Sequence, residues 1–376
     1  MSDNSAVSLT RDLVRIPSTN PEHTEKACAL LLEPLLKHAG FDVSFFEAAA
    51  NHTNLIARLP GDDPKLSPLC LCSHLDTVPL GGTPWALDPF AAEIRDNKLY
   101  GRGSADTKSS VAAMVVAAIR LSRLAGRRAG LLLVMAADEE RANRGAKAMA
   151  DVPGLLGKAG ALVIGEPTSN RPCVGHKGAL WLEAETLGVA AHGSMPELGE
   201  NAIYKAVEAI QKLAAFNFGN ARHPLMGRPT LNVGTIRGGL NINSVPNHAV
   251  FGLDIRTVAG QSHRDVFDAI RKLAGDGVSF TRLTDMESVF TPPDNPWVRE
   301  VFDICERLSG IRPEPECLMY FTDAPALQPA LGHPPTLILG PGDAGQAHKT
   351  DEYCPVGNIE KSESIYFEIC RKWCIK

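Results

Sequence analysis

The chain alternates short apolar runs that suit buried strands with longer segments whose apolar residues recur at helical spacing. The apolar runs lie at 68–76, 130–140, 160–167 and 335–342, and helical spacing covers 24–40 and 108–126. Shorter strands are expected at 42–48 and 54–61. Apolar strands that alternate with helices predict an α/β fold, with a mostly parallel central sheet covered by helices on both faces.

The middle of the chain has a different pattern. An exposed strand is predicted at 179–188, further strands at 230–239 and 248–258, and amphipathic helices at 199–216 and 263–275. This order indicates a small antiparallel sheet with helices on one face. We therefore expect an inserted α+β domain at 179–289, which interrupts an α/β domain formed by 1–178 and 290–376.

The composition narrows the class of protein. The 376 residues suit two domains, and 44% hydrophobic with 22% charged residues are typical of a globular protein. The net charge of −5 comes without a long basic block, so neither nucleic acid nor a membrane is an expected partner. The first residues lack the pattern of a signal peptide. The chain has nine cysteines, an odd number, and lacks the cysteine pattern of a small disulfide-bonded domain. This favours reduced thiols in a cytoplasmic protein.

Histidines and carboxylates follow the ends of the apolar runs. His74 and Asp76 end the first run, Asp138, Glu139 and Glu140 the second, and Glu166 the third, while His348 follows the fourth. Asp106 lies in a glycine-bearing loop before the 108–126 helix. Because ligands of open α/β sheets collect outside the carboxyl ends of the strands, we expect these side chains to converge.

A metal centre would explain this set of residues. Carboxylates gathered without basic partners repel one another and are costly to desolvate, and a cation relieves both costs. Histidine mixed with carboxylate favours zinc or a similar ion, and the number of ligands suits two ions sharing one carboxylate, about 3.5–4 Å apart.

Each residue also has an ordinary interpretation. Asp106 could be a helix N-cap, Glu139 and Glu140 a helix start, Glu166 a turn acid and His348 a surface histidine. Cys70 and Cys72 could form a Cys-x-Cys-x-His metal site with His74, although two small apolar residues on a strand is the favoured interpretation. The joint placement of the acids and histidines at strand ends favours the metal centre.

Several longer motifs point to a known family. They are "SHLDTVP", "LYGRGSADTKSS", "DEERANRGA", "GEPT", "AHGSMPELGENAI", "NSVPNHAVFGLDIR" and "GPGDAGQAHKTDEY". In this order they resemble the dizinc amidohydrolase family of acetylornithine deacetylase, succinyl-diaminopimelate desuccinylase, aminoacylase and glutamate carboxypeptidase, over nearly the whole chain. The tail, with "YFTDAPALQ", resembles the acetylornithine deacetylase branch. Two departures are "DTKSS", where the family often has Asp-Met-Lys-Gly-Gly, and Ala142, where it often has glycine.

The resemblance implies a role for each candidate residue. His74 and Glu166 would hold one ion, Glu140 and His348 the other, and Asp106 would bridge them. Glu139 would be the general base, and Asp76 would orient His74. His192 would reach a partner subunit's active site and stabilise the oxyanion, while Asn243 and Arg256 would grip the substrate carboxylate. Thr322 is expected to contact the substrate.

The implied reaction is metal-dependent hydrolysis of the amide bond of an N-acyl amino acid, with N-acetylornithine as the leading candidate. Two divalent ions are expected as cofactors, zinc first, with cobalt or manganese as alternatives. The inserted domain would act as a lid and join two chains in a homodimer. The alternatives are a desuccinylase, an aminoacylase, a dipeptidase or an amidase on a non-peptide acid. A non-catalytic, metal-stabilised dimeric binding protein is a more distant alternative, against which Glu139 argues.

Overall fold

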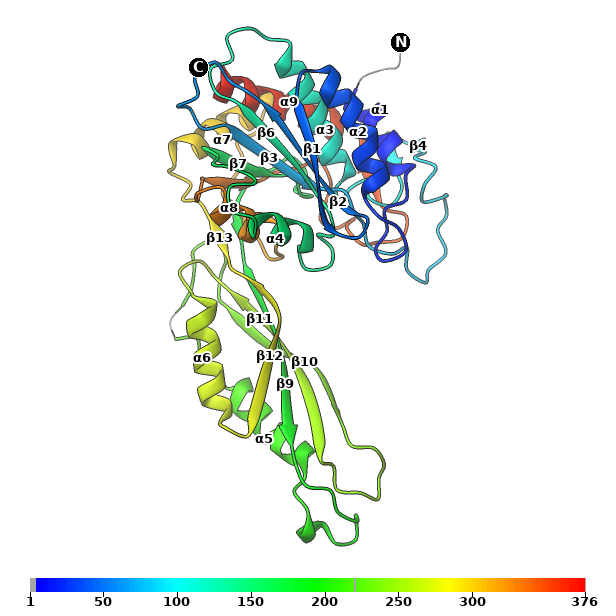
Figure 1. The fold of residues 1–376 in the computed structure, drawn as a ribbon, viewed down its shortest axis with the longest axis vertical. Coiled ribbons are helices and arrows are strands. Elements are labelled where there is room, and N and C mark those ends of the chain that lie inside the picture. The colour runs from blue at the N-terminus through cyan, green and yellow to red at the C-terminus, as the bar shows by residue number, and fades with distance from the viewer. Residues whose placement is uncertain (1–4, 220, 376) are drawn as a thin grey trace. The chain divides into compact units, whose positions relative to one another are not determined.

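The computed structural model describes residues 5–219 and 221–375, which fall into two compact units (Figure 1). Unit 1 contains the chain up to 175, 291–316 and the chain from 322 onward. Unit 2 contains 176–290 and 317–321. The bounds of the main insertion differ from the expected 179–289 by up to three residues. The short segment 317–321, which also belongs to unit 2, was not expected there.

Unit 1 is built on a mixed sheet whose centre is parallel. Its strands run in the order β1 (Asp42–Ala49), β2 (His52–Leu59), β6 (Leu131–Ala136), β3 (Leu69–His74), β7 (Ala161–Ile164), β15 (Thr336–Ile338) and β8 (Cys173–His176). The four strands β6, β3, β7 and β15 are parallel, whereas β1, β2 and β8 are antiparallel to their neighbours. The predicted fold class, α/β with a mostly parallel central sheet, is confirmed. Two short strands, β13 (Val289–Phe290) and β14 (Glu316–Leu318), lie at the boundaries of the units.

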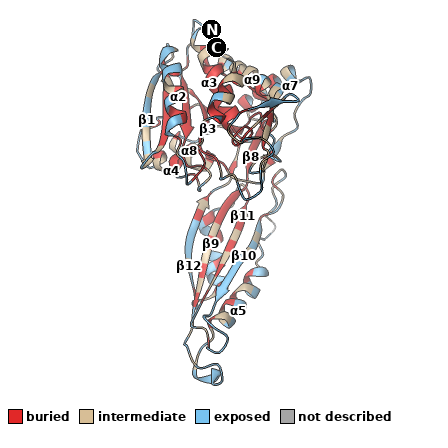
Figure 2. Ribbon diagram, turned by 90° about the vertical axis from the view of Figure 1, so that its right-hand side faces the viewer, coloured by how far each residue is buried: buried red, intermediate tan, exposed pale blue. Residues whose placement is uncertain are grey.

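The apolar runs form the central strands because both of their faces are covered. Every residue of β3, β6 and β7 is buried. The helices of unit 1 are α1 (Ala6–Val14), α2 (Lys26–His38), α3 (Lys108–Ser122), α4 (Arg144–Ala150), α7 (Pro296–Ser309), α8 (Ala324–Ala330) and α9 (Val356–Cys374). Helix α3 packs against α1 and α9, and its red colour in Figure 2 reflects that twelve of its fifteen residues are buried.

The direction in which the chain adds strands to the sheet reverses at β3. From β3 the chain passes through α3 to β6 on one side, and from β6 through α4 to β7 on the other side of β3. Because such crossovers are right-handed, α3 and α4 cover opposite faces of the sheet. The carboxyl ends of strands at such a reversal are where ligands bind in open α/β sheets.

A small second sheet in unit 1 joins distant parts of the chain. Strand β5 (Lys98–Tyr100) lies between β4 (Ile94–Arg95) and β16 (Tyr353–Pro355) and is antiparallel to both. Its register pairs Tyr100 with Tyr353. The loop that follows β5 therefore begins beside the residues that precede β16.

Unit 2 is an antiparallel sheet with two helices. The strands run in the order β10 (Thr230–Gly238), β11 (His248–Thr257), β9 (Gly178–Leu187) and β12 (Val278–Met286). Helices α5 (Ala202–Ala214) and α6 (His263–Ala274) share an apolar core with the sheet that includes Leu182, Phe251 and Ile270, and a single 3₁₀ turn, η1, spans Pro196–Leu198.

One expectation for unit 2 is wrong. The segment 179–188 was interpreted as an exposed strand, but β9 pairs with β11 on one side and β12 on the other. Strand β12 was not predicted, because polar residues interrupt its alternation. The edge strands are therefore β10 and β12. Among the described residues, no helix combines the length and the apolar character needed to cross a bilayer.

Candidate metal and catalytic site

The candidate ligands of unit 1 converge at the carboxyl ends of the parallel strands. His74 ends β3, Glu140 follows β6, Glu166 follows β7, His348 follows β15, and Asp106 lies two residues before the start of α3. Their ligand atoms form two groups, His74–Asp106–Glu166 and Asp106–Glu140–His348, and within each group all lie within 4.8 Å of one another. Asp106 belongs to both groups. The pairing of residues is the one that the family resemblance implied.

The two oxygens of Asp106 face different histidines. Oδ1 lies 3.1 Å from Nε2 of His74, and Oδ2 lies 3.4 Å from Nε2 of His348. The same His348 nitrogen lies 3.0 Å from Oε2 of Glu140. A carboxylate with one oxygen directed toward each group has the geometry of a bridging ligand.

The ordinary interpretations of these residues do not fit the structure. Helix α3 begins at Lys108 with Thr107 as its N-cap, so Asp106 does not cap it. No helix begins at Glu139 or Glu140, because α4 starts only at Arg144. Glu166 is 5% exposed, which is unusual for a turn acid. His348 is exposed, as a surface histidine would be, but its Nε2 lies 3.4 Å from a carboxylate oxygen of Asp106 and 3.0 Å from one of Glu140.

The electrostatics show excess negative charge. Burial raises the pKa of Glu140 to about 7, with Asp106 as the next cause, and burial also raises the pKa of Glu166 well above its usual range. Asp106 is the exception. Burial alone would raise its pKa, but hydrogen bonds with His348 and His74 outweigh burial and lower the pKa below its usual range. Hydrogen bonds with Asp106 and Glu140 raise the pKa of His348 to about 10.

The donor set fits divalent cations. Oε1 of Glu140 is buried and has no hydrogen-bond partner among the described residues, as expected of a ligand atom. Two cations would neutralise the excess negative charge, and imidazole with carboxylate suits zinc and similar ions.

Asp76 supports the site through more contacts than expected. Its carboxylate lies 3.5 Å from Nδ1 of His74, whereas the Asp76 backbone oxygen lies closer to that nitrogen, at 3.0 Å. The carboxylate accepts the backbone N–H groups of Glu139 at 3.0 Å and Glu140 at 3.1 Å, and the Asn20 side-chain amide at 2.8 Å. Asp76 therefore ties the turn after β6 to the end of β3.

Glu139 belongs to a buried network that the sequence interpretation missed. Its Oε1 accepts a hydrogen bond from the Asn143 amide at 3.0 Å, and the same amide donates to Asp323 at 2.8 Å. Burial raises the pKa of Glu139 well above its usual range, and that of Asp323 to about 6. Asp323 lay within the quoted "TDAP" element, but the expected substrate contact was assigned to its neighbour Thr322.

Thr322, the expected substrate contact, is fully buried, and its hydroxyl accepts the backbone N–H of Ala324 at the start of α8. This hydrogen bond gives the side chain a local structural role. Contact of Thr322 with the substrate stays a prediction.

The two departures from the family pattern leave the site intact. Ala142 has a φ of 68°, in the left-handed region that glycine adopts without strain. Lys108 of "DTKSS" is buried and donates to the backbone oxygens of Leu13 and Ile16 at 3.0 and 2.7 Å. It therefore anchors the start of α3 to the end of α1.

Among the described residues, no cysteine belongs to a group of side chains that could hold a metal ion. All nine cysteines are buried. Burial raises the pKa values of the Cys70 and Cys72 thiols, which disfavours the thiolate that a metal site needs. The favoured interpretation of these two residues, as small apolar residues of β3, agrees with the structure.

The remaining candidates belong to unit 2. Backbone bonds join the His192 and Asn243 segments: Gly193 N–H donates to the Asn243 oxygen at 2.8 Å, and His192 bridges Ser244. The His192 ring contacts the Ser194 hydroxyl at 2.7 Å. Arg256 lies near the other end of the sheet, where its side chain pairs with Asp254 at 2.8 Å.

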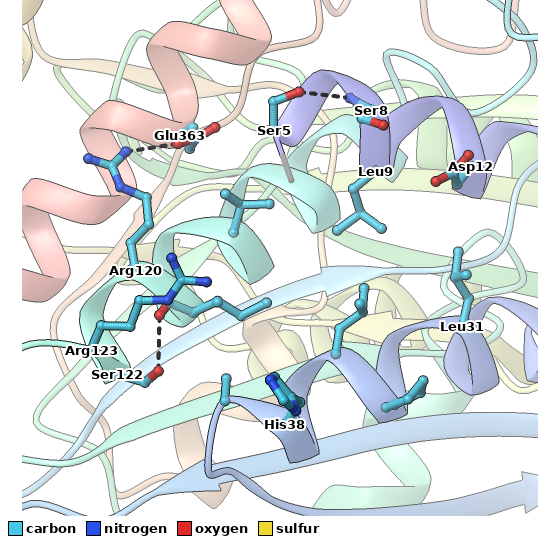
Figure 3. Close-up of a pocket in the computed structure, with 15 residues that line it drawn as sticks. Ser5, Ser8, Leu9, Asp12, Leu31, His38, Arg120, Ser122, Arg123 and Glu363 are labelled. Carbon is cyan, nitrogen blue, oxygen red and sulfur yellow. Dashed lines mark hydrogen bonds and ion pairs between the residues drawn. The ribbon is translucent and has the colours of Figure 1, made fainter. Parts of the chain in front are cut away.

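A cavity of about 980 Å³ in unit 1 is separate from this site (Figure 3). Residues of α1, α2 and the C-terminal end of α3 line it, and Figure 3 shows Arg120 paired with Glu363 at its border. Arg120 follows Asp106 by fourteen residues, a distance of about 20 Å along a helix. The cavity is therefore no part of the proposed metal centre.

Comparisons with known proteins agree with this geometry. Residues 70–372 match Peptidase family M20/M25/M40. The chain is 30% identical to the acetylornithine deacetylase of Photorhabdus laumondii, with 98% of this chain and 97% of the relative covered. It is also 30% identical to the acetylornithine deacetylase of Erwinia tasmaniensis, at the same coverage.

Solved structures share the fold. The M20 family metallo-carboxypeptidase Sso-CP2 of Sulfolobus solfataricus superimposes with a TM-score of 0.80 at 18% identity, over 99% of both chains. The YXEP protein of Bacillus subtilis, described as a dinuclear metal binding peptidase, has a TM-score of 0.74 at 16% identity, over 97% of this chain and 96% of its own.

Proposed function

Because this chain belongs to Peptidase family M20/M25/M40, we propose that it is a dinuclear metal hydrolase that cleaves the amide bond of N-acyl amino acids. One observation carries the proposal: Asp106 is shared by two His-carboxylate groups. Glu139, a buried carboxylate that belongs to neither group, lies next to Glu140 and is free to act as a base.

We assign His74 and Glu166 to one ion, Glu140 and His348 to the other, and Asp106 to both. Zinc fits this donor set, and cobalt or manganese could replace it. Two such ions would lower the pKa of a water and polarise the scissile carbonyl.

Glu139 would accept a proton from the attacking water and later donate it to the departing amine. Three features of the chain suit it to this task. Its backbone is held by Asp76, one of its oxygens is held by Asn143, and burial raises its pKa above the usual range of a glutamate, which suits a group that takes up and later releases a proton. A metal-stabilised binding protein would have no use for such a base.

The proposed substrate is an N-acyl amino acid, with N-acetylornithine first. The full-length similarity to acetylornithine deacetylases supports this choice. Arg256 would bind the α-carboxylate as a charge-assisted fork. Other members of the family act on peptides, so a dipeptidase is the second candidate.

The positions of the unit 2 residues support a homodimer. Arg256 lies eight residues along β11 from His248, about 27 Å in an extended strand, whereas His192 and Asn243 lie beyond the other end of that strand. One small substrate cannot reach both ends of the sheet. We therefore propose that His192 and Asn243 act on the site of a second copy, with His192 stabilising the oxyanion.

The surface of unit 2 offers a face for this pairing. Strand β10 is an edge strand, and exposed apolar residues lie on it, on the loop that follows it and on α5: Ile236, Leu240, Ile242, Tyr204 and Val207. An exposed edge strand with apolar neighbours is typical of an interface between copies of a chain.

A substrate panel tests the proposal. Protein loaded with two equivalents of zinc would be given N-acetylornithine, N-succinyl-diaminopimelate and a set of dipeptides, and free amine would be measured. We expect the highest kcat/KM with N-acetylornithine. Preference for a dipeptide would move the chain to the second candidate, and hydrolysis of no amide would refute the proposed function.

A further inference from the structure

Glu352 is a fully buried glutamate near the proposed metal centre that belongs to neither ligand group. It follows His348 by four residues in the "HKTDEY" motif and directly precedes β16. No role was assigned to it from the sequence. A buried carboxylate needs several donors to offset its desolvation, so its contacts indicate what it does.

Both oxygens of Glu352 are occupied by the loop that carries Asp106. Oε1 accepts the backbone N–H groups of Ala105 at 2.7 Å and Asp106 at 3.0 Å. Oε2 accepts the backbone N–H of Gly103 at 3.0 Å and Nη1 of Arg102 at 2.7 Å. One of these four donors is the backbone N–H of the bridging residue itself.

Arg102 extends the same link to a third segment. Its guanidinium is buried and also donates to the backbone oxygens of Lys349 at 3.2 Å and Pro79 at 3.1 Å. Lys349 is the neighbour of His348, and Pro79 follows the His74 segment. The ion pair therefore connects the three segments that carry Asp106, His348 and His74.

The backbone fixes the same register. Strand β16 pairs with β5, and the Gly101 N–H continues this ladder by donating to the backbone oxygen of Glu352 at 2.9 Å. The Glu352 side chain then turns back onto the next five residues. Backbone pairing alone brings the loops together, whereas the carboxylate determines where the Asp106 peptide lies.

We propose that Glu352 is a positioning residue that fixes Asp106 against His348, so that the Asp106 carboxylate can be shared by two ions. This inference rests on the dinuclear centre of the proposed function. Glu352 acts through the backbone of Asp106 and touches neither an ion nor the substrate.

The substitution Glu352→Gln separates this role from simple packing. Glutamine has the same size and shape, but one of its two oxygens becomes an NH₂ group. Whichever way the amide turns, that NH₂ faces two donors of the loop, so at least two of the four hydrogen bonds are lost. Size is preserved, whereas the negative charge and half of the acceptor capacity that holds the Asp106 loop are removed.

A matched control lies at the border of the cavity in Figure 3. Glu363 also accepts from an arginine and a backbone N–H, with Arg120 at 2.8 Å and Ala6 at 3.2 Å. It lies on α9, away from the metal ligands. Glu363→Gln therefore removes the same kind of interaction without touching the Asp106 loop.

The experiment is a titration of metal-free protein with zinc by calorimetry and with cobalt by visible absorption, with circular dichroism as the check of folding. Relative to wild type, we expect Glu352→Gln to raise the Kd of at least one ion tenfold or more and to change the cobalt spectrum. Glu363→Gln should stay within twofold. Wild-type affinity for both ions in folded Glu352→Gln would overturn the inference.

A second variant decides the matter if Glu352→Gln does not fold. Arg102→Lys keeps the charge but cannot reach Glu352, Lys349 and Pro79 at once, because a single ammonium replaces the guanidinium fork. A rise in Kd of threefold or more supports the inference, and an unchanged Kd overturns it. Wild-type protein that binds two ions without cleaving any N-acyl amino acid would refute the proposed substrate. The metal titrations of the variants would still test the role of Glu352 in that case.

Discussion

The carboxylate of Asp76 accepts the backbone N–H of Glu139 at 3.0 Å. The sequence assigned Asp76 to the orientation of His74 alone, but the structure shows that it also holds the turn that carries the proposed base. The same carboxylate accepts the N–H of Glu140, a proposed metal ligand. One side chain thus contacts a proposed ligand of each ion and the backbone of the proposed base.

Glu139→Gln tests the base directly. Glutamine keeps the size of the side chain but cannot take up a proton, so we expect kcat to fall by about 10²- to 10⁴-fold while two ions still bind. Steady-state kinetics and metal analysis on the same sample check this. The control Glu93→Gln changes an exposed glutamate of unit 1 and should leave kcat unchanged. Near-native turnover in Glu139→Gln would remove Glu139 from the mechanism.

Asp76→Asn should weaken both metal binding and turnover. The amide can accept at only one of its two positions, so it cannot hold both glutamate N–H groups and the Asn20 amide as the carboxylate does. Supporting carboxylates of this kind contribute about 10- to 100-fold in affinity or activity. Asp88→Asn is a suitable control, because Asp88 accepts the backbone N–H of Phe90 in an exposed loop. Equal zinc affinity in the two variants would argue against the role of Asp76.

Mixing two inactive variants tests whether His192 acts on a partner subunit. Glu139→Gln lacks the base, and His192→Ala lacks the proposed oxyanion donor. If His192 acts in trans, a mixed dimer contains one complete site, and random exchange at equal amounts should restore about a quarter of wild-type activity. No recovery despite proven subunit exchange would place His192 at the site of its own chain or outside catalysis.

His176 should make the stability of the apo-protein pH-dependent. It is fully buried, and burial lowers its pKa from 6.5 to about 4. The unfolded state therefore binds more protons between these values, so the free energy of unfolding falls as the pH drops from 6.5 toward 4.

Substitution of His176 should remove this part of the pH dependence. Between pH 7 and pH 5, His176→Gln should lose about 2 kcal/mol less stability than wild type. Denaturant unfolding at the two pH values measures the difference, whatever the absolute stability of the variant. His38→Gln, at an exposed histidine, serves as the control. Equal pH dependence in wild type and His176→Gln would show that His176 does not titrate on unfolding.

The sequence predicted the features that depend on local pattern. Apolar runs such as those of β3 and β6 predicted the parallel centre of the sheet, and the polar residues at their ends predicted the candidate ligands. The family resemblance, which the similarity to acetylornithine deacetylases confirms, gave their expected pairing. Strand β12 was missed because its alternation is weak, and β9, which was expected to be exposed, lies between β11 and β12.

The missed residues of the site share a different cause. Asn143, Asp323 and Glu352 contact the site through hydrogen bonds between segments far apart in the chain, such as Asn143 to Asp323 and Glu352 to Gly103. A single sequence carries no periodic signal for such contacts. Thr322 and Asp323 lie in one motif, and only the fold shows that Asp323 is linked to Glu139 through Asn143.

Anomalous X-ray scattering from crystals of the zinc-loaded protein would locate the ions directly. We expect two zinc peaks about 3.5–4 Å apart on either side of the Asp106 carboxylate, one near His74 and Glu166 and the other near Glu140 and His348. A further His-carboxylate group, Glu25–His52–Asp138, should stay empty. Zinc at that group, with no pair of peaks at Asp106, would refute the proposed dinuclear centre.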